Sequence, residues 1–323
     1  MKTCCQLLSA AEASSLIRCI GPFSVHYGEA KGVIEVFSGD PKHPVKKLNL
    51  LGLSYAASLT GLSWLLSEEL NAEARVAIFA ARDGCSFSAG IDLKELSGTS
   101  LPPVGGAAAT AAASTDCKAP AMLLQSQHRM VRAFQDGVSS LARCRIPIIA
   151  AIDRHCIGGA TSIASACDVR YATRRATFSV KEAAVGLSAD IGALQRLPTI
   201  IGEGRTRELA FTCRDFSGAE AKEMGFVEEV CADYPALLAH ARMRAAQIAA
   251  NSPLGVQNTK LVLNWERERV AQRSLEYQAA INAFSLRCND IPEAARAFAE
   301  RRAPVFTDYM VNPTGGLPQT KQS

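Results

Sequence analysis

The sequence predicts an α/β fold in which strands and helices alternate. Residues 33–37 (VIEVF) and 76–80 (VAIFA) are short, apolar and contain the β-branched side chains that favour strands. Between them, residues 50–70 repeat leucine at helical spacing, with Leu59 and Leu62 on one side. A strand, a helix and a second strand in this order predict two parallel strands joined by a right-handed crossover.

The composition is that of an ordinary globular protein. The chain has 323 residues, of which 48% are hydrophobic and 20% are charged, and this length suits one large domain or two modest ones. The formal net charge of +4 is too small to indicate a nucleic acid or an acidic membrane surface as a partner. No apolar run approaches the roughly 20 residues of a membrane-spanning helix. We therefore expect neither nucleic acid nor a membrane among its partners.

The 11 cysteines are spaced irregularly and form no C-x-x-C motif. This pattern argues against a disulfide framework and against a zinc site. We therefore expect a reducing compartment and no metal.

The alternation of strands and helices is interrupted at residues 97–121. The stretch LPPVGGAAATAAAST has no period, which predicts a surface insertion; a short alanine-rich helix is the alternative. The rest of the core is expected as a helix at 122–143, a strand at 146–152, a helix of small residues ending at 166, and strands at 169–172 and 177–180.

From residue 217 onward the sequence predicts helices only. Pro253 and Pro292 stand at or near the first position of a helix, where proline is tolerated. Asp168 and Arg170 in the preceding core are expected to form a structural ion pair. The expected helices are 218–224, 235–250, 253–265, 274–287 and 292–302.

Two glycine-containing turns, residues 87–92 (FSAGID) and 156–160 (CIGGA), each come directly before an expected helix. Glycine allows backbone N–H groups to approach a ligand closely, and a helix N-terminus favours negative charge. Two such turns can together hold one carbonyl oxygen, as in an oxyanion hole. The alternative is that each is only a turn.

Two carboxylates, Glu182 and Asp190, stand eight positions apart in residues 181–192, a stretch otherwise made mainly of Ala, Val, Gly, Leu and Ile. Carboxyl groups in apolar surroundings have raised pKa values and can exchange protons near neutral pH. The alternative is that both are solvated loop or cap residues.

Three motifs, FSAGIDL, CIGGA and KEAAVGLSADIGALQRLPTIIG, together resemble the enoyl-CoA hydratase/isomerase (crotonase) family, over roughly residues 23–309. The resemblance implies a crotonase-like spiral of β-β-α turns with a helical C-terminal trimerisation region. It also implies a homotrimer or a hexamer of two trimers, an acyl-CoA thioester as substrate, and no metal or redox cofactor.

The expected organisation follows from this resemblance. The core covers residues 23–250, including the insertion at 97–121, and the helical C-terminal region covers 251–309. Residues 1–22 are expected as an N-terminal extension with a possible targeting role, and 310–323 as a tail.

The resemblance also assigns site residues. It places the two oxyanion-hole N–H groups at Ile91 and Gly159, the CoA adenine beside Ala89, and the CoA phosphates within reach of Lys94. The two glutamates of the family's hydratases fall on Ser162 and Glu182, which disfavours simple hydratase activity because serine cannot activate water as a carboxylate does.

The nearest match within the family is the dienoyl-CoA isomerases, whose three pocket acids fall on Ser162, Glu182 and Asp190. The resemblance implies an isomerase that moves the double bonds of 3,5-dienoyl-CoA to the 2,4 positions, in the β-oxidation of unsaturated fatty acids. Glu182 would serve C2 and Asp190 would serve C6, while Ser162 lines the substrate pocket.

Several alternatives remain open. They are a Δ3-Δ2-enoyl-CoA isomerase, an enoyl-CoA hydratase, and a non-catalytic relative that binds CoA esters or RNA. The C-terminal Lys321-Gln322-Ser323 differs from the peroxisomal address Ser-Lys-Leu, which favours a mitochondrial location over a peroxisomal or cytoplasmic one.

Overall fold

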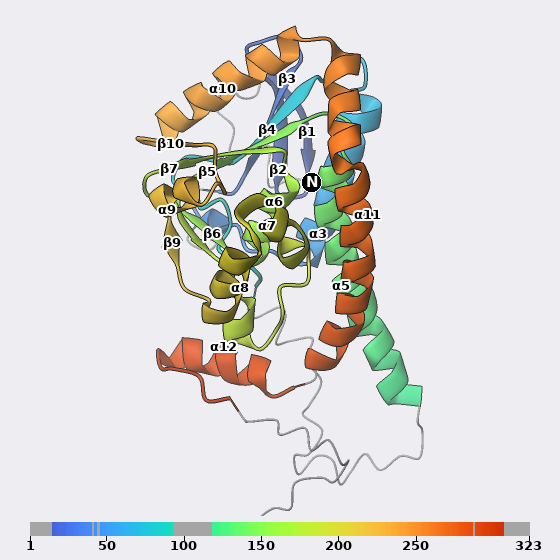
Figure 1. The fold of residues 1–323 in the computed structure, drawn as a ribbon, viewed down its shortest axis with the longest axis vertical. Helices are drawn as coiled ribbons and strands as arrows, with labels where there is room; N and C mark the ends of the chain where they lie inside the picture. Colours follow the sequence, from blue (N-terminus) through green and yellow to red (C-terminus); the bar gives the residue numbers. More distant parts are fainter. Residues whose placement is uncertain (1–14, 41, 44–45, 93–117, 287, 307–323) are drawn as a thin grey trace, which may run out of the picture.

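The computed structural model describes residues 15–40, 42–43, 46–92, 118–286 and 288–306. Its centre is a seven-stranded sheet in the order β1-β2-β3-β4-β5-β7-β10 (Figure 1). The pairs β1–β2 and β2–β3 are antiparallel, and all later pairs of this sheet are parallel. The strands are β1 (Leu16–Ile20), β2 (Phe23–Tyr27), β3 (Val33–Ser38), β4 (Val76–Ala81), β5 (Ile148–Ile152), β7 (Val169–Thr173) and β10 (Glu229–Cys231).

A second, three-stranded sheet has the order β6-β8-β9. Its strands are β6 (His155–Ile157), β8 (Thr177–Ser179) and β9 (Phe216–Ser217). The β6–β8 pair is parallel and β8–β9 is antiparallel. Because β5 leads into β6 and β7 leads into β8, consecutive strands alternate between the two sheets, as expected for a spiral.

Helices cover both faces of the large sheet. Helix α10 (Tyr234–Ala250) packs on one face (Figure 1). Its Leu237 and Ala241 belong to one buried cluster with side chains of β4 and β5. Helices α3, α5 and α6 cover the other face. The helices and helical turns are η1 (Lys46–Leu48), α3 (Leu53–Trp64), η2 (Leu65–Glu69), α5 (Lys118–Arg143), α6 (Gly159–Ala166), η4 (Glu182–Val185), α7 (Ala193–Ile201), α8 (Glu203–Thr212), α9 (Gly218–Glu223), α10 (Tyr234–Ala250), α11 (Pro253–Ser285) and α12 (Asp290–Glu300).

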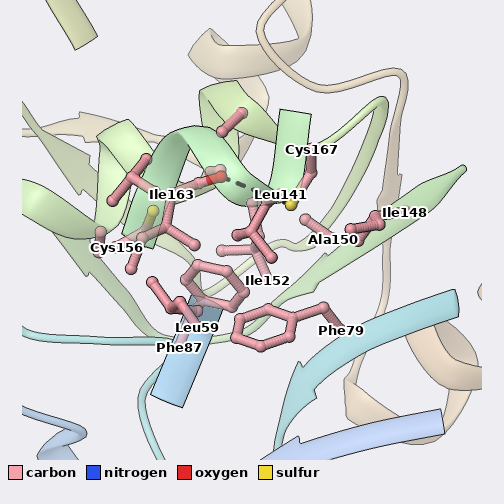
Figure 2. Close-up of a cluster of buried hydrophobic side chains, with 14 of the residues drawn as sticks. Leu59, Phe79, Phe87, Leu141, Ile148, Ala150, Ile152, Cys156, Ile163 and Cys167 are labelled. Carbon is pink, nitrogen blue, oxygen red and sulfur yellow. Dashed lines mark hydrogen bonds between the residues drawn. The ribbon is translucent and has the colours of Figure 1, made fainter. Parts of the chain in front are cut away.

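The main core lies between the large sheet and helices α3, α5 and α6. Figure 2 shows Phe79 of β4 and Ile152 of β5 meeting Leu59 of α3, Leu141 of α5 and Ile163 of α6. Every residue of β4 and β5 is buried, which is why these strands read as continuous apolar runs. Helix α6 consists of small residues and is buried along its whole length, so it can pack closely against its neighbours.

Helix α11 lies along α5 (Figure 1) and buries polar as well as apolar residues. Its inner side contains charged and amide residues, among them Lys260 and Glu268, whose ion pairs anchor it to the core. Its outer side exposes apolar residues such as Trp265, which is 69% exposed. None of the helices in the described part of the chain combines the length and apolar character that crossing a membrane requires.

Most expected elements are present, and the structure corrects four points. Residues 16–20, expected within an N-terminal extension, form β1 at the edge of the sheet, and β2 also appears. Strand β10 occurs where only helices were expected. It has only 3 residues, too few to form a recognisable strand pattern, and it pairs in parallel with β7 at the edge of the sheet. The two expected helices 253–265 and 274–287 form one helix, α11. Glu268, one of the polar residues between them, accepts a hydrogen bond from the buried Arg196 of the core.

The fourth correction concerns the ion pair expected between Asp168 and Arg170. Arg170 instead pairs with Glu228 at 2.9 Å, and Asp168 pairs with Lys260 at 2.7 Å. The expected insertion at 97–121 lies mostly outside the described residues, although its last four residues already belong to α5.

Candidate active site

Two glycine turns, one after β4 and one after β6, lie side by side. The N–H of Ile157 donates to the carbonyl oxygen of Ser88 at 3.1 Å. Gly90 has φ +95°, and a Cβ at this position would lie 2.9 Å from the carbonyl oxygen of Ile157, so this close approach requires glycine. The structure therefore brings together the turns that contain Ile91 and Gly159.

The N–H groups of Ile91 and Gly159 have no acceptor among the described residues. The neighbouring N–H of Ala89, in contrast, donates to the carbonyl oxygen of Leu48 at 2.8 Å. Gly159 is the first residue of α6, and the first N–H groups of a helix have no partner within it. Two unengaged donors at adjacent turns can stabilise an oxygen that gains negative charge.

Two apolar side chains, Leu51 and Ile191, flank Gly159. A Cβ at Gly159 would lie 2.8 Å from Cδ1 of Leu51 and 3.0 Å from Cδ1 of Ile191. Leu51 also forms a parallel bridge with Ile91, so this residue contacts both turns. Because Ile191 directly follows Asp190, the chain segment that contains Asp190 lies against the second glycine turn.

Glu182 begins the 3-10 helical turn η4, shortly after β8. Both of its carboxylate oxygens are buried and have no hydrogen-bond partner among the described residues. A Cβ at Gly158 would lie 3.6 Å from Oε1 of Glu182, which places this carboxyl group beside the second glycine turn. Burial raises the pKa of Glu182 to about 7, and the negative charge of Asp190 adds to this effect.

Asp190 precedes the turn into α7 and is bound from two helices. Nδ2 of Asn282 in α11 donates to Oδ2 of Asp190 at 2.7 Å, and Nε2 of Gln135 in α5 donates to its carbonyl oxygen at 2.8 Å. Burial raises the pKa of Asp190 to about 6, although the hydrogen bond from Asn282 acts in the opposite direction. Glu182 and Asp190 therefore both titrate near neutral pH.

Ser162 lies one turn after Gly159 on α6 and is fully buried. Its Oγ accepts a hydrogen bond from the N–H of Ala193 at 3.1 Å. Ala193 is the first residue of α7, so the Ser162 hydroxyl satisfies one of the free donors at the start of that helix. Its role in the substrate pocket stays a prediction.

The residues expected to bind CoA are only partly described. Ala89 is half-buried and is held against η1 by its hydrogen bond to Leu48. Lys94 lies outside the described residues. The exposed Lys46 and Lys47 of η1 come close to Ala89 in the fold, and the sequence reasoning missed them because a short lysine pair in a loop has no distinctive pattern.

The sequence reasoning also missed the two amides that hold Asp190. Asn282 is 92 positions away in the chain and Gln135 is 55 positions away, so no local pattern links them to the acidic segment. No group of three or more His, Cys, Asp or Glu side chains within the described ranges is arranged to hold a metal ion.

Comparison with known proteins relates the chain to acyl-CoA enzymes. Residues 104–309 match the model of the enoyl-CoA hydratase/isomerase family. The chain is 35% identical to a peroxisomal Δ3,5-Δ2,4-dienoyl-CoA isomerase of Arabidopsis thaliana, over 85% of this chain and 92% of the plant protein. It is 36% identical to the mitochondrial Δ3,5-Δ2,4-dienoyl-CoA isomerase of Mus musculus, over 70% of this chain and 66% of the mouse protein, just under two thirds of its length.

Solved structures agree with this relationship. The crystal structure of an enoyl-CoA hydratase/isomerase from Mycobacterium paratuberculosis is 25% identical and superposes with a TM-score of 0.69, covering 85% of this chain and 98% of that one. The predicted fold, a crotonase-type α/β core with a helical C-terminal region, is thereby confirmed.

Proposed function

Because this chain belongs to the enoyl-CoA hydratase/isomerase family, we propose that it is a Δ3,5-Δ2,4-dienoyl-CoA isomerase of fatty-acid β-oxidation. One observation carries the proposal: two acids with raised pKa values border the glycine turns, Glu182 by its carboxyl group beside Gly158, and Asp190 through the next residue, Ile191, beside Gly159. The names of the plant and mouse relatives agree with it.

In the proposed reaction the thioester oxygen lies between the N–H groups of Ile91 and Gly159. The C2–H bond breaks and its proton passes to the Glu182 carboxylate. The electron pair moves along the conjugated chain, and its charge rests partly on the thioester oxygen, where two donors contribute several kcal/mol. Asp190 then donates a proton to C6 and becomes a carboxylate, which leaves double bonds at C2 and C4.

Two separate acids suit this reaction because C2 and C6 lie several bonds apart along the acyl chain. A single group cannot reach both without moving, whereas Glu182 and Asp190 lie on different segments, η4 and the turn before α7. The pKa of about 7 for Glu182 and about 6 for Asp190 allow each to accept or donate a proton near neutral pH. The reaction moves protons only, so its balance requires neither a metal nor a redox cofactor.

The CoA part of the substrate is proposed to lie beside Ala89. Lys46 and Lys47 are exposed on the turn bonded to Ala89, and lysine side chains there can attract the CoA phosphates together with Lys94.

The test is an ultraviolet assay of 3,5-dienoyl-CoA, because the conjugated 2,4-dienoyl thioester has its own absorbance. The parent protein should form this product, and Asp190→Asn should lower kcat by a factor of about 100 or more, as loss of a general acid does. The matched control is Asp83→Asn, which removes a carboxylate that is 69% exposed and should retain parental activity. Equal rates for the parent and Asp190→Asn would refute the assignment.

A second candidate is a Δ3-Δ2-enoyl-CoA isomerase that uses one carboxylate. It is favoured by Ser162, which stands where the resemblance implies a third acid and instead binds the N–H of Ala193. Parallel assays separate the two: this candidate predicts faster turnover of 3-enoyl-CoA than of 3,5-dienoyl-CoA, and full activity on 3-enoyl-CoA in Asp190→Asn.

We also propose that the protein assembles as a homotrimer or as a hexamer of two trimers. The outer side of α11 supports this, because Leu261, Val262 and Trp265 are 62%, 74% and 69% exposed and form an apolar surface that another subunit can cover. Light scattering should give three or six times the chain mass for the parent and for the control Met243→Glu on α10. Trp265→Glu should give a smaller species, and a monomeric parent would contradict the proposal.

The proposed location is the mitochondrion. The mouse relative is named mitochondrial and the plant relative peroxisomal, so relatives occupy both organelles. A fluorescent fusion of the full chain, imaged with markers for both compartments, distinguishes them; removal of residues 1–14 should abolish mitochondrial import if they direct it.

A further inference from the structure

The side-chain amide of Asn282, in α11, is hydrogen-bonded to the loop that contains Asp190. Nδ2 of Asn282 donates to Oδ2 of Asp190 at 2.7 Å and to the carbonyl oxygen of Ser188 at 2.8 Å. Oδ1 of Asn282 accepts from Oγ of Ser188 at 2.9 Å. Asn282 has no exposed surface, so no solvent competes for these bonds.

The orientation of this amide follows from its partners. The carbonyl oxygen of Ser188 can only accept, so the group of Asn282 that faces it must be the NH2 group. The Ser188 hydroxyl accepts from Nε2 of Gln278 at 3.1 Å, which leaves its own hydrogen for Oδ1 of Asn282. The same network therefore points an N–H of Asn282 at Asp190.

Other contacts hold the loop by its backbone rather than by the carboxyl group. Nε2 of Gln278 donates to the carbonyl oxygen of Ala189 at 2.9 Å, and Gln135 donates to the carbonyl oxygen of Asp190. Among the described residues, Asn282 supplies the one side-chain hydrogen bond to the carboxyl group of Asp190.

We infer that Asn282 is a positioning residue for Asp190: it fixes one carboxyl oxygen so that the other, Oδ1, is presented to the acyl chain. This inference rests on the proposed role of Asp190 at C6. A short, buried hydrogen bond restricts the rotation of the carboxyl group and also stabilises the carboxylate that remains after a proton is donated. Asn282 thus makes Asp190 a stronger acid than burial alone would.

The charged groups around Asp190 do not replace this contact. Glu182 on η4 is the neighbouring acid, and its charge raises rather than lowers the pKa of a second carboxyl group. Arg132 of α5 binds Oε1 of Gln135 at 3.1 Å, one residue removed from Asp190. Arg196 of α7 is paired with Glu268.

The test compares two buried amides of the same helix. Asn282→Leu removes the donor to the carboxyl group at similar volume, whereas Gln278→Leu removes contacts to Ser188, to Gln195 and to backbone but none to the carboxyl group. In Asn282→Leu we expect the titration of Asp190, followed by infrared spectroscopy as a difference from Asp190→Asn, to move upward by about 1 to 2 pH units. The pH optimum of kcat should move in the same direction, because Asp190 can donate only while it is protonated, and kcat should fall about 10-fold with little change in KM.

In Gln278→Leu the midpoint of Asp190 should stay in place. An unchanged midpoint in Asn282→Leu, or equal shifts in both variants, would overturn the inference. Should Asn282→Leu fail to fold, Asn282→Ala removes the same donor and should give a shift in the same direction; no shift there overturns the inference as well. The infrared titration needs no substrate, so an inactive parent would refute the proposed isomerase activity without deciding the role of Asn282.

Discussion

Replacing Glu182 with glutamine should stabilise the protein at alkaline pH. Both carboxylate oxygens of Glu182 are buried without a hydrogen-bond partner among the described residues, so its charged form is disfavoured in the folded state. Its pKa is raised from 4.5 to about 7, while in the unfolded chain it returns to its ordinary value. Between these two pH values the folded protein holds a proton that the unfolded chain has released, so stability falls as the pH rises.

The magnitude follows from the size of this change. At about 1.4 kcal/mol per pKa unit, the charged Glu182 destabilises the folded state by about 3 kcal/mol at pH 8, and by about 1 kcal/mol at pH 5. Glutamine has the same shape and no charge, and the unpaired amide it introduces affects both pH values equally. The gain in unfolding free energy from Glu182→Gln should therefore be larger at pH 8 than at pH 5 by about 2 kcal/mol.

The assay is denaturant unfolding of parent and variant at both pH values and at one fixed protein concentration, because assembly also affects stability. The control is Glu223→Gln, which removes an exposed carboxylate. The reasoning holds that Glu182 is a buried charge that lowers stability. It would be refuted if Glu182→Gln raised the unfolding free energy equally at pH 5 and pH 8, or if Glu223→Gln changed it with the same pH dependence.

Two further predictions concern α6. Gly159→Ala should lower kcat/KM about 10-fold or more and reduce stability by about 1–3 kcal/mol, because the new Cβ displaces Leu51 and Ile191 beside the proposed oxygen site. The control is Gly204→Ala, whose Cβ has nothing within 4 Å; it should lower neither kcat/KM nor stability in the same assays. Ser162→Ala should reduce the unfolding free energy by about 1–2 kcal/mol, since it leaves the first N–H of α7 without its acceptor; unchanged denaturant midpoints would show that this bond contributes nothing.

The sequence predicts the core well because its signals are local. Residues 76–80 and 146–152 are apolar throughout and lie in strands buried on both faces, so pattern and structure coincide. The turns around Gly90 and Gly158 are also readable, because a backbone with positive φ favours glycine at those positions.

The arrangement of α11 is not readable in this way. A helix that packs on a core is expected to be apolar on its inner side, but α11 buries Lys260, Glu268 and Asn282 beside its apolar residues and exposes Trp265. Its contacts to Asp168, Arg196 and Asp190 join segments far apart in the chain, and no residue spacing indicates them. The part of the candidate site that depends on α11 therefore had to come from the structure.

The unequal environments of the two acids bear on how the proposed reaction returns to its starting state. Glu182 has no donor among the described residues, whereas Asn282 stabilises the charged form of Asp190, so a single proton shared by the pair resides mainly on Glu182. Proton transfer from C2 to Glu182 and from Asp190 to C6 ends in that favoured arrangement. The position of the proton thus favours the chemical step, but returning a proton to Asp190 through solvent costs the same free energy, so the pair leaves the equilibrium between substrate and product unchanged.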